Sequence, residues 1–322
     1  MKALMYTGIR QLEVQELPEP AGEFVVGVLG SAICGTDLKT YLQGHPKFKP
    51  PTILGHEFIG RVLRAPEGCG FSADDIVNVA PYGECGVCGL CRRGAGELCS
   101  NKDYSPTGSF CEMVEIPLPF ASRGLIKMDT PDFAFVLSEP LACILCALEM
   151  LDITNDSRAL IIGGGPMGVL FAEALCGRGV PVSISEVNPL RADRLKGWGF
   201  DVHAPGDVKF GDYDNIVVAV NKPELVSDAV RDIADCGTVH MFSGMPASSM
   251  IDVDAYSIHY RKVRLVGCSG FALRHFSAAH EIIKADPGRY RKLITHYFKM
   301  EEGAGAFELL SEGNAFKVLI QP

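Results

Sequence analysis

Four cysteines lie within fifteen residues of one another, at Cys85, Cys88, Cys91 and Cys99, in the spacing C-x-x-C-x-x-C-x(7)-C. Four thiolates at such short spacing can enclose one tetrahedral Zn²⁺ and leave no coordination position open, so a site of this kind stabilises a loop and takes no part in catalysis. The alternatives are a redox dithiol and an iron–sulfur cluster, whose usual cysteine spacings differ from this one. The spacing therefore predicts a structural zinc site.

A glycine-rich loop follows the apolar run at residues 158–162 and precedes a helical pattern at residues 167–178. A strand before such a loop and a helix after it are the setting in which glycines let the backbone approach a pyrophosphate at the helix N-terminus. We therefore expect this loop to bind a dinucleotide. The loop satisfies G-x-G-x-x-G, and its expected contact residues are Gly163, Gly165, Pro166, Met167 and Gly168.

The next expected strand, residues 181–186, ends in the acidic residue Glu186, which is 18 residues beyond Gly168. A carboxylate at about this separation binds the ribose hydroxyls of NAD, which predicts NAD as the cofactor. Arg191 lies nearby in the sequence and could stack on the adenine or contact a 2′-phosphate. NADP therefore stays open as an alternative.

The elements that position these residues fall into two groups. Up to about residue 140 the chain has short alternating segments, such as residues 23–29 and 58–63, which are typical of a β-rich domain. Beyond that point, strands alternate with helices, as in a doubly wound α/β unit with a parallel sheet. We expect strands at 158–162, 181–186, 215–220, 237–242 and 263–267, helices around 167–178, 189–198 and 223–235, and a closing strand at 315–320. The predicted domains are residues 1–140 with 271–322, and residues 141–270.

Composition limits the functions that are open to the chain. Its 322 residues favour two domains, and 47% hydrophobic with 21% charged residues is typical of a globular protein. The net charge of −9, with scattered basic residues, argues against nucleic acid as a partner. No apolar run is close in length to the ~20 residues that a membrane-spanning helix needs, and the N-terminal residues do not have the pattern of a signal peptide. We predict a cytoplasmic protein without membrane or nucleic-acid partners, whose twelve cysteines serve metal binding and packing.

Several segments in order along nearly the whole chain resemble the zinc-containing medium-chain dehydrogenase/reductase family, particularly its sorbitol and threonine dehydrogenase branch. The resemblance implies a GroES-like catalytic domain interrupted by a Rossmann domain, with the active site in the cleft between them. Besides the cysteine lobe and the glycine loop, the matching segments are Ile33-Cys34-Gly35-Thr36-Asp37, Leu54-Gly55-His56-Glu57, Glu139-Pro140-Leu141, Leu293-Ile294-Thr295-His296 and Lys317-Val318-Leu319-Ile320.

The same resemblance implies a second, catalytic zinc, which makes two zinc ions per chain. Cys34 and His56 would bind it, and Glu57 and Glu139 would complete its coordination sphere or exchange with it. A zinc ion with an open position polarises an alcohol oxygen and stabilises the alkoxide, while NAD⁺ accepts the hydride.

Proton release is the point at which the chain departs from the family pattern. By resemblance, Thr36 lies beside the metal and accepts the alcohol proton first, and water then takes the proton from the nicotinamide ribose or from Glu57. Lys39 stands where the family often has a histidine at the end of a proton relay. We expect Lys39 to be a solvated surface residue, because a lysine of ordinary pKa, ~10, is a poor acceptor at neutral pH. The alternative is a terminal base whose pKa is lowered by burial near the metal.

The function predicted from these features is the oxidation of a secondary alcohol, of polyol, cyclitol or amino-alcohol type, to a ketone with NAD⁺. One alternative is an NADPH-dependent zinc aldehyde or ketone reductase. Another is a catalytically silent, cofactor-binding protein of the same fold. By analogy with the family we also expect a homo-oligomer, a dimer or tetramer, paired through the apolar edge at residues 262–267.

Overall fold

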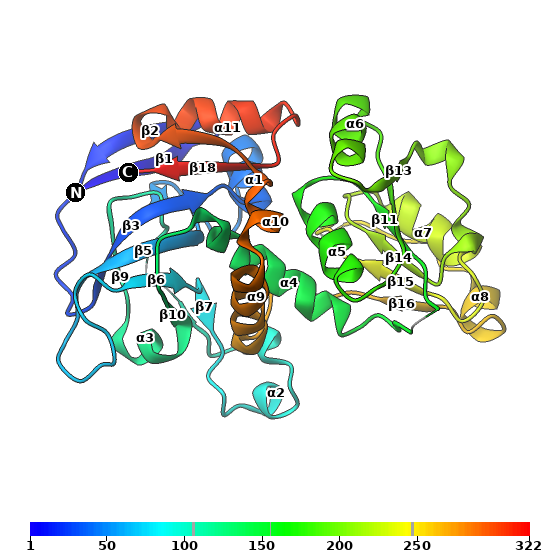
Figure 1. Ribbon diagram of the computed structural model, residues 1–322, viewed down its shortest axis with the longest axis horizontal. Coiled ribbons are helices and arrows are strands. Elements are labelled where there is room, and N and C mark those ends of the chain that lie inside the picture. The colour runs from blue at the N-terminus through cyan, green and yellow to red at the C-terminus, as the bar shows by residue number, and fades with distance from the viewer. Residues whose placement is uncertain (105–106, 155, 246–247) are drawn as a thin grey trace. The chain divides into compact units, whose positions relative to one another are not determined.

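The computed structural model describes residues 1–104, 107–154, 156–245 and 248–322. The chain divides into two compact units (Figure 1). Unit 1 comprises Met1–Ala142 and Phe271–Pro322, and unit 2 comprises Cys143–Gly270. In the described part of the chain, no helix is both long enough and apolar enough to cross a membrane.

Unit 1 is built around a seven-stranded sheet in the order β10-β6-β5-β3-β18-β17, with β9 also paired to β3. The strand β18 comes from the second segment of the unit and pairs with β3 from the first segment, so the two segments share one sheet. The strands are β1 (Lys2–Gly8), β2 (Gln11–Glu16), β3 (Val25–Ala32), β4 (Thr52–Ile53), β5 (Glu57–Arg64), β6 (Ile76–Val79), β7 (Tyr82–Gly83), β8 (Asp103–Tyr104), β9 (Met113–Glu115), β10 (Leu125–Met128), β17 (Ile294–Lys299) and β18 (Lys317–Gln321).

Helices and short 3₁₀ turns connect these strands. The helices are α1 (Gly35–Gln43), α2 (Gly89–Arg92), α3 (Leu118–Gly124), α9 (Leu273–Ala285), α10 (Pro287–Arg291) and α11 (Gly303–Ser311), and the 3₁₀ turns are η1 (Gly96–Leu98), η2 (Phe133–Leu137) and η5 (Met300–Glu302). The helix α4 (Ser138–Leu148) begins in unit 1 and ends in unit 2.

The strands of unit 1 are rich in β-branched and aromatic residues, and Val26, Ile59 and Val77 on three neighbouring strands have no exposed surface.

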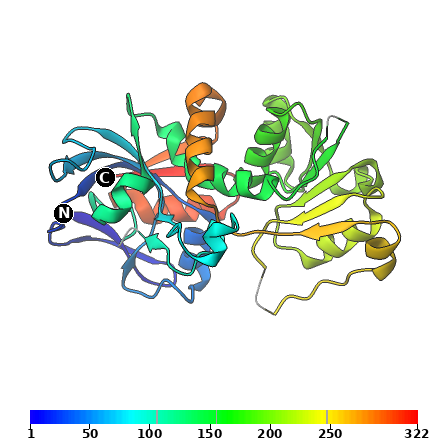
Figure 2. The ribbon, with the colours of Figure 1, turned by 90° about the horizontal axis from the view of Figure 1, so that it is seen from below.

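Unit 2 contains one parallel sheet of six strands in the order β13-β12-β11-β14-β15-β16. Figure 2 draws the strands and helices of this unit in green to gold. Its elements are β11 (Ala159–Ile162), α5 (Pro166–Cys176), β12 (Val182–Ser185), α6 (Pro189–Gly197), β13 (Asp201–His203), η3 (Pro205–Asp207), η4 (Phe210–Asp212), β14 (Asn215–Val218), α7 (Pro223–Asp232), β15 (Thr238–Met241), α8 (Ala255–His259) and β16 (Arg264–Val266).

Both faces of this sheet are covered. Alternate residues of β11 and β14, such as Leu160 and Ile216, pack with Val226 of α7 in one buried cluster. On the other face, the Phe171 ring of α5 lies 6.3 Å from the His240 ring of β15, centroid to centroid. The strand order reverses between β11 and β14, which is the point where dinucleotides bind in sheets of this type. The predicted fold class, a β-rich GroES-like domain with a doubly wound Rossmann domain, is confirmed.

The sequence prediction missed one strand of this sheet. The edge strand β13 has three residues, of which Val202 is buried, while Asp201 and His203 are not. A segment this short shows no periodicity, and its pairing with β12 makes it a strand. The five strands that were predicted are all present and somewhat shorter than expected, because their ends continue into turns.

Candidate functional site

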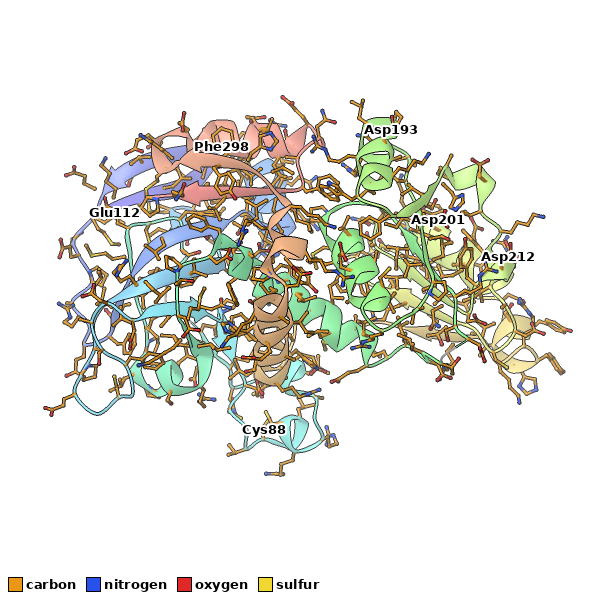
Figure 3. The ribbon with its side chains drawn as sticks, in the orientation of Figure 1. Cys88, Glu112, Asp193, Asp201, Asp212 and Phe298 are labelled. Carbon is orange, nitrogen blue, oxygen red and sulfur yellow. The ribbon has the colours of Figure 1, made fainter. Side chains whose placement is uncertain are left out.

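The four cysteines of the predicted zinc site come together in a lobe that follows β7. Their sulfur atoms lie 3.4 Å (Cys88–Cys91), 3.5 Å (Cys85–Cys99), 3.8 Å (Cys88–Cys99) and 3.9 Å (Cys85–Cys91) apart. A tetrahedron with metal–sulfur bonds of about 2.3 Å has edges of about 3.8 Å, so four thiolates at these separations fit one zinc ion. All four cysteines are free thiols. Figure 3 marks Cys88 on this lobe.

The backbone of the lobe favours thiolates. The amide N–H of Cys91 is the main group that lowers the pKa of Cys88, to about 6. The backbone amides of Cys85 and Asn101 donate to the sulfur of Cys99, at 3.5 and 3.3 Å. Because a metal binds the thiolate form, donors that point at these sulfurs favour metal binding.

The lobe is also bonded to the segment at which the chain returns to unit 1. The Glu84 carboxylate accepts from the backbone N–H of Leu273, the first residue of α9, at 2.9 Å. Arg274 donates to the Gly94 carbonyl at 3.0 Å, and the Tyr82 hydroxyl accepts from the Phe271 N–H at 2.9 Å. The cysteine lobe therefore holds the N-terminal end of α9.

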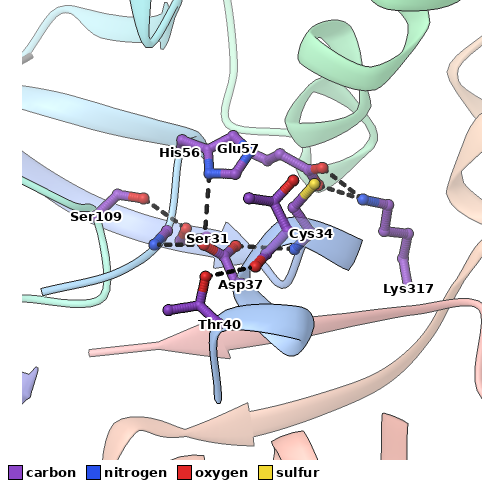
Figure 4. A network of polar contacts seen from close by, with 10 residues as sticks. Ser31, Cys34, Asp37, Thr40, His56, Glu57, Ser109 and Lys317 are labelled. Carbon is purple, nitrogen blue, oxygen red and sulfur yellow. Dashed lines mark hydrogen bonds and ion pairs between the residues drawn. The ribbon is translucent and has the colours of Figure 1, made fainter. Parts of the chain in front are cut away.

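A second group of metal-ligating residues lies where β3 ends and β5 begins. The antiparallel register places Ala32 opposite Glu57, so the residues just after β3 meet those at the start of β5. Cys34 forms the N-cap of α1 there. One ligand atom each from Cys34, His56 and Glu57 lies within 4.8 Å of the other two (Figure 4). Three predicted metal ligands are thus brought together by one pair of strands.

Asp37, in the first turn of α1, fixes the geometry of this group. Its carboxylate accepts from the backbone N–H groups of Cys34 at 3.0 Å and Gly55 at 3.2 Å. The same carboxylate lies 3.5 Å from Nδ1 of His56, and Asp37 is 1% exposed. A carboxylate on one ring nitrogen orients an imidazole and leaves the other nitrogen for a metal.

Lys317 neutralises Glu57. Its ammonium group lies 2.6 and 2.5 Å from the two carboxylate oxygens, and both residues are buried, at 3% and 0% exposure. Figure 4 shows the Lys317 side chain reaching Glu57 beside Cys34. Burial alone would lower the pKa of Lys317, but the charge of Glu57 raises it above its ordinary value. The two charges therefore support each other inside the protein.

Glu139, in the first turn of α4, belongs to the same electrostatic group. It is 8% exposed, and burial raises its pKa to about 7, with the charge of Glu57 acting in the same direction. His56 and Lys317 act against that shift. A carboxylate with this pKa changes its charge readily when a cation approaches.

The electrostatics of Cys34 and His56 are those of a site for a cation. Burial raises the pKa of the Cys34 thiol. Burial alone would lower the pKa of His56, yet Asp37 and Cys34 raise it well above its ordinary value. The negative groups around His56 therefore favour a positive charge, and a divalent cation would displace the imidazole proton.

The predicted proton-relay residues lie on α1. Thr36 is exposed in the first turn of the helix, two residues after Cys34, and its carbonyl accepts from the Thr40 hydroxyl at 2.8 Å. Lys39 is exposed on the same helix. The exposure of Lys39 agrees with our expectation of a solvated residue.

In unit 2, the glycine loop joins β11 to α5. Gly163 has a φ of +105°, and a Cβ at Gly168 would lie 1.9 Å from the Gly163 carbonyl oxygen, so both positions require glycine. Gly165 is the N-cap of α5 and Pro166 is its first residue, and no side chain caps the helix. The first-turn amides thus remain available for a phosphate. Met167 follows in the same turn.

Glu186 lies directly after β12 and contacts this loop. Its carboxylate accepts from the backbone N–H groups of Gly164 and Asn188, both at 2.8 Å, and from the Arg191 guanidinium at 3.1 Å. It is 5% exposed. Glu186 therefore connects the loop to the strand end where a ribose would lie, and Arg191 is its ion partner.

Two residues that contact the group of Cys34, His56 and Glu57 were missed as site residues in the sequence. The two residues, Asp37 and Lys317, both occur in the matching segments. Asp37 could have been found from its place three residues after Cys34, because an acid at that distance caps a helix start. Lys317 is 260 residues from Glu57 in the sequence, and only the sheet order brings them together.

Residues 20–125 match the family model of the alcohol dehydrogenase GroES-like domain. The chain is 28% identical over 318 residues to the D-altritol 5-dehydrogenase of Agrobacterium fabrum, with 94% of each chain covered. It is also 28% identical over 345 residues to the L-threonine 3-dehydrogenase of Pyrococcus horikoshii, with 99% of this chain and 98% of the relative covered. The structure of 2R,3R-butanediol dehydrogenase from Bacillus subtilis superposes with a TM-score of 0.86 at 23% identity, covering 100% of this chain and 99% of that one.

The chain thus contains an alcohol dehydrogenase GroES-like domain, and it is similar over nearly its whole length to proteins named as dehydrogenases. The family match covers the segment that carries Cys34, His56, Glu57 and the cysteine lobe. The relatives extend over both units of this dehydrogenase. The protein is an alcohol dehydrogenase.

Proposed function

We propose that this dehydrogenase oxidises a secondary alcohol of a polyol, cyclitol or amino alcohol to a ketone, with NAD⁺ as hydride acceptor. The observation that carries the proposal is the convergence of Cys34, His56 and Glu57, with ligand atoms within 4.8 Å of one another, beside the buried Glu139. Relatives named for altritol and threonine both act on a carbon that bears a hydroxyl group, which supports this substrate class. An assay of polyols, aminocyclitols and amino alcohols with NAD⁺ tests it, and the absence of turnover with all three classes would contradict it.

Cys34 and His56 would hold the catalytic zinc, and Glu57 and Glu139 would complete its coordination or exchange with the substrate. The donor set fits the metal, because zinc accepts thiolate, imidazole and carboxylate ligands and a catalytic site keeps a position open. Zinc bound there would supply a Lewis acid that polarises the alcohol oxygen. Asp37 orients His56, and Lys317 restrains Glu57 through their ion pair.

Proton transfer and cofactor binding would be carried out by residues of both units. Thr36 would accept the alcohol proton through its hydroxyl group. Gly163, Gly165, Pro166, Met167 and Gly168 would cradle the pyrophosphate at the start of α5, and Glu186 would bind the adenosine ribose. The cysteine lobe would hold the second, structural zinc through Cys85, Cys88, Cys91 and Cys99.

The two proposed zinc sites should differ in lability, because four thiolates close one site while the other keeps an open position. Mild chelation should therefore remove one zinc and abolish alcohol oxidation while the circular dichroism of the folded protein stays unchanged. Metal content, activity and circular dichroism measured on the same samples check this. Simultaneous loss of both metals and of the fold would contradict the assignment. A single zinc per chain in the untreated protein would favour the catalytically silent alternative.

Replacing Glu186 should relax the choice of nicotinamide cofactor. Glu186→Ser removes a carboxylate that would bind the ribose and repel a 2′-phosphate, and it leaves Arg191 without this ion partner. Hydrogen bonds to a charged group contribute about 1.5–3 kcal/mol, so the ratio of kcat/KM for NAD⁺ over NADP⁺ should fall by about ten-fold or more. Glu186→Gln, which keeps the shape, is the matched control for charge alone. A wild-type enzyme that already prefers NADPH would overturn the assignment of Glu186 and favour the reductase alternative.

We further propose that the protein is a cytoplasmic homo-oligomer, a dimer or tetramer. The support is the edge position of β16 in the sheet of unit 2, together with the exposed Tyr256 of α8 and Tyr260 directly after it, at 60% and 69% exposure. A parallel sheet that ends in an uncovered strand offers an edge to a second copy.

A further inference from the structure

Three buried polar side chains meet in unit 1 from three separate elements. Asn78 lies on β6, Ser138 is the first residue of α4, and His280 lies on α9. The Asn78 amide nitrogen is 2.7 Å from the Ser138 hydroxyl and 3.1 Å from Nδ1 of His280. The three residues are 1%, 0% and 2% exposed. None of them is among the predicted site residues.

The direction of the hydrogen bonds follows from the chemistry of the groups. An amide nitrogen only donates, so one of its two N–H groups goes to Ser138 and the other to His280. Nδ1 of His280 must then accept, which places the ring proton on Nε2. Burial lowers the pKa of His280, which keeps the ring neutral, and the Phe135 ring packs against it with centroids 4.6 Å apart. Both N–H groups of the Asn78 amide are therefore satisfied.

The location of the network relates it to the catalytic cluster. Ser138 directly precedes Glu139, and both belong to the first turn of α4. Asn78 pairs with Ile59 of β5, the strand that begins with Glu57. The network thus ties the start of the helix that carries Glu139 to the sheet that carries Glu57.

We propose that Asn78 and His280 are positioning residues that hold the first turn of α4 and thereby keep Glu139 against the metal-ligating cluster. This inference rests on the proposed function, in which Glu139 serves the catalytic zinc. His280 fixes the orientation of the Asn78 amide, and the amide fixes Ser138. If Nδ1 of His280 is removed, one N–H of the Asn78 amide is buried without a partner. The Asn78 amide can then rotate away from Ser138. Outer groups that orient metal ligands typically change metal affinity by about 10–100-fold.

The test measures how fast zinc leaves the folded protein to a chromogenic chelator. Wild type should release zinc in two phases, with the slow phase from the cysteine lobe as an internal reference. His280→Leu should accelerate the fast phase by about ten-fold or more and leave the slow phase unchanged. His280→Asn, which keeps an acceptor in place of Nδ1, should restore a rate near that of wild type.

Ile283→Ala is the matched control, because Ile283 lies on the same helix and is fully buried without a polar group. It should lower thermal stability without accelerating the fast phase. Ser138→Ala removes only a hydroxyl group and should act in the same direction as His280→Leu, so the test holds even if His280→Leu does not fold. Equal acceleration by Ile283→Ala, or no acceleration by either His280→Leu or Ser138→Ala, would overturn the proposal. A wild-type protein with zinc only in the cysteine lobe would overturn the proposed function and this inference together.

Discussion

Lys317→Met should lower the free energy of unfolding by about 3–5 kcal/mol, because it leaves the buried charge of Glu57 without its cation. Glu57 has no exposed surface, and both of its oxygens contact the Lys317 ammonium group. Urea unfolding measured after mild chelation, so that no metal ion compensates the lost charge, gives the value. The double variant Glu57→Gln/Lys317→Met should recover most of the loss, because no charge then remains buried.

The exposed pair Lys2–Glu301 provides the control for this experiment. Its ammonium and carboxylate groups lie 2.8 Å apart, but the side chains are 48% and 51% exposed. Solvent and salt screen ion pairs between exposed groups, so Lys2→Met should have little effect on the free energy of unfolding. A loss below about 1 kcal/mol in Lys317→Met would contradict this expectation.

Thr36→Val should lower kcat for alcohol oxidation by about 100-fold or more, because it removes the hydroxyl group that would accept the substrate proton. Valine keeps the branched shape, and Thr36 lies in the first turn of α1, two residues after Cys34. Thr36→Ser keeps the hydroxyl group and is the matched control. Steady-state rates and zinc content measured together separate a chemical defect from a loss of metal.

Variants of Lys39 and Thr36 measured in the same assay test which group passes the alcohol proton to solvent. Lys39 is exposed, so Lys39→Ala should change the rate at most a few-fold. A collapse of alcohol oxidation in Lys39→Ala that added small amines rescue would make Lys39 the terminal base. Activity in Thr36→Val close to that of wild type would remove Thr36 from the mechanism.

Local motifs made much of this molecule predictable. The cysteine lobe spans residues 85–99, and the glycine loop lies between one strand and one helix, so neighbours in the sequence are neighbours in space. The central parallel strands β11 and β14 of unit 2 have apolar runs that mark them without help from the rest of the fold. The resemblance to a family supplied Cys34, His56 and Glu139, whose types alone would have favoured ordinary buried or surface roles.

The residues that support the catalytic cluster could not be predicted in the same way. The Lys317–Glu57 pair and the Asn78–His280 contact each join positions more than 200 residues apart, as their separations of 260 and 202 show. Which side chains meet across such distances depends on strand order and register, and a one-residue change of register would turn each side chain to the opposite face. The short edge strand β13 was not predicted for a related reason, because its three residues form a strand only by pairing with β12.

The place of β18 between β3 and β17 sets an order of events during synthesis of the chain (Figure 1). The cysteine lobe is complete within residues 85–99, so it can take up its metal as soon as that stretch leaves the ribosome. Lys317, in contrast, can join Glu57 only after all of unit 2 has been made and β18 has entered the sheet. Until then the nascent chain holds Glu57 without its ammonium partner. The charge of Glu57 is therefore balanced by Lys317 only when the last strand of the chain is in place.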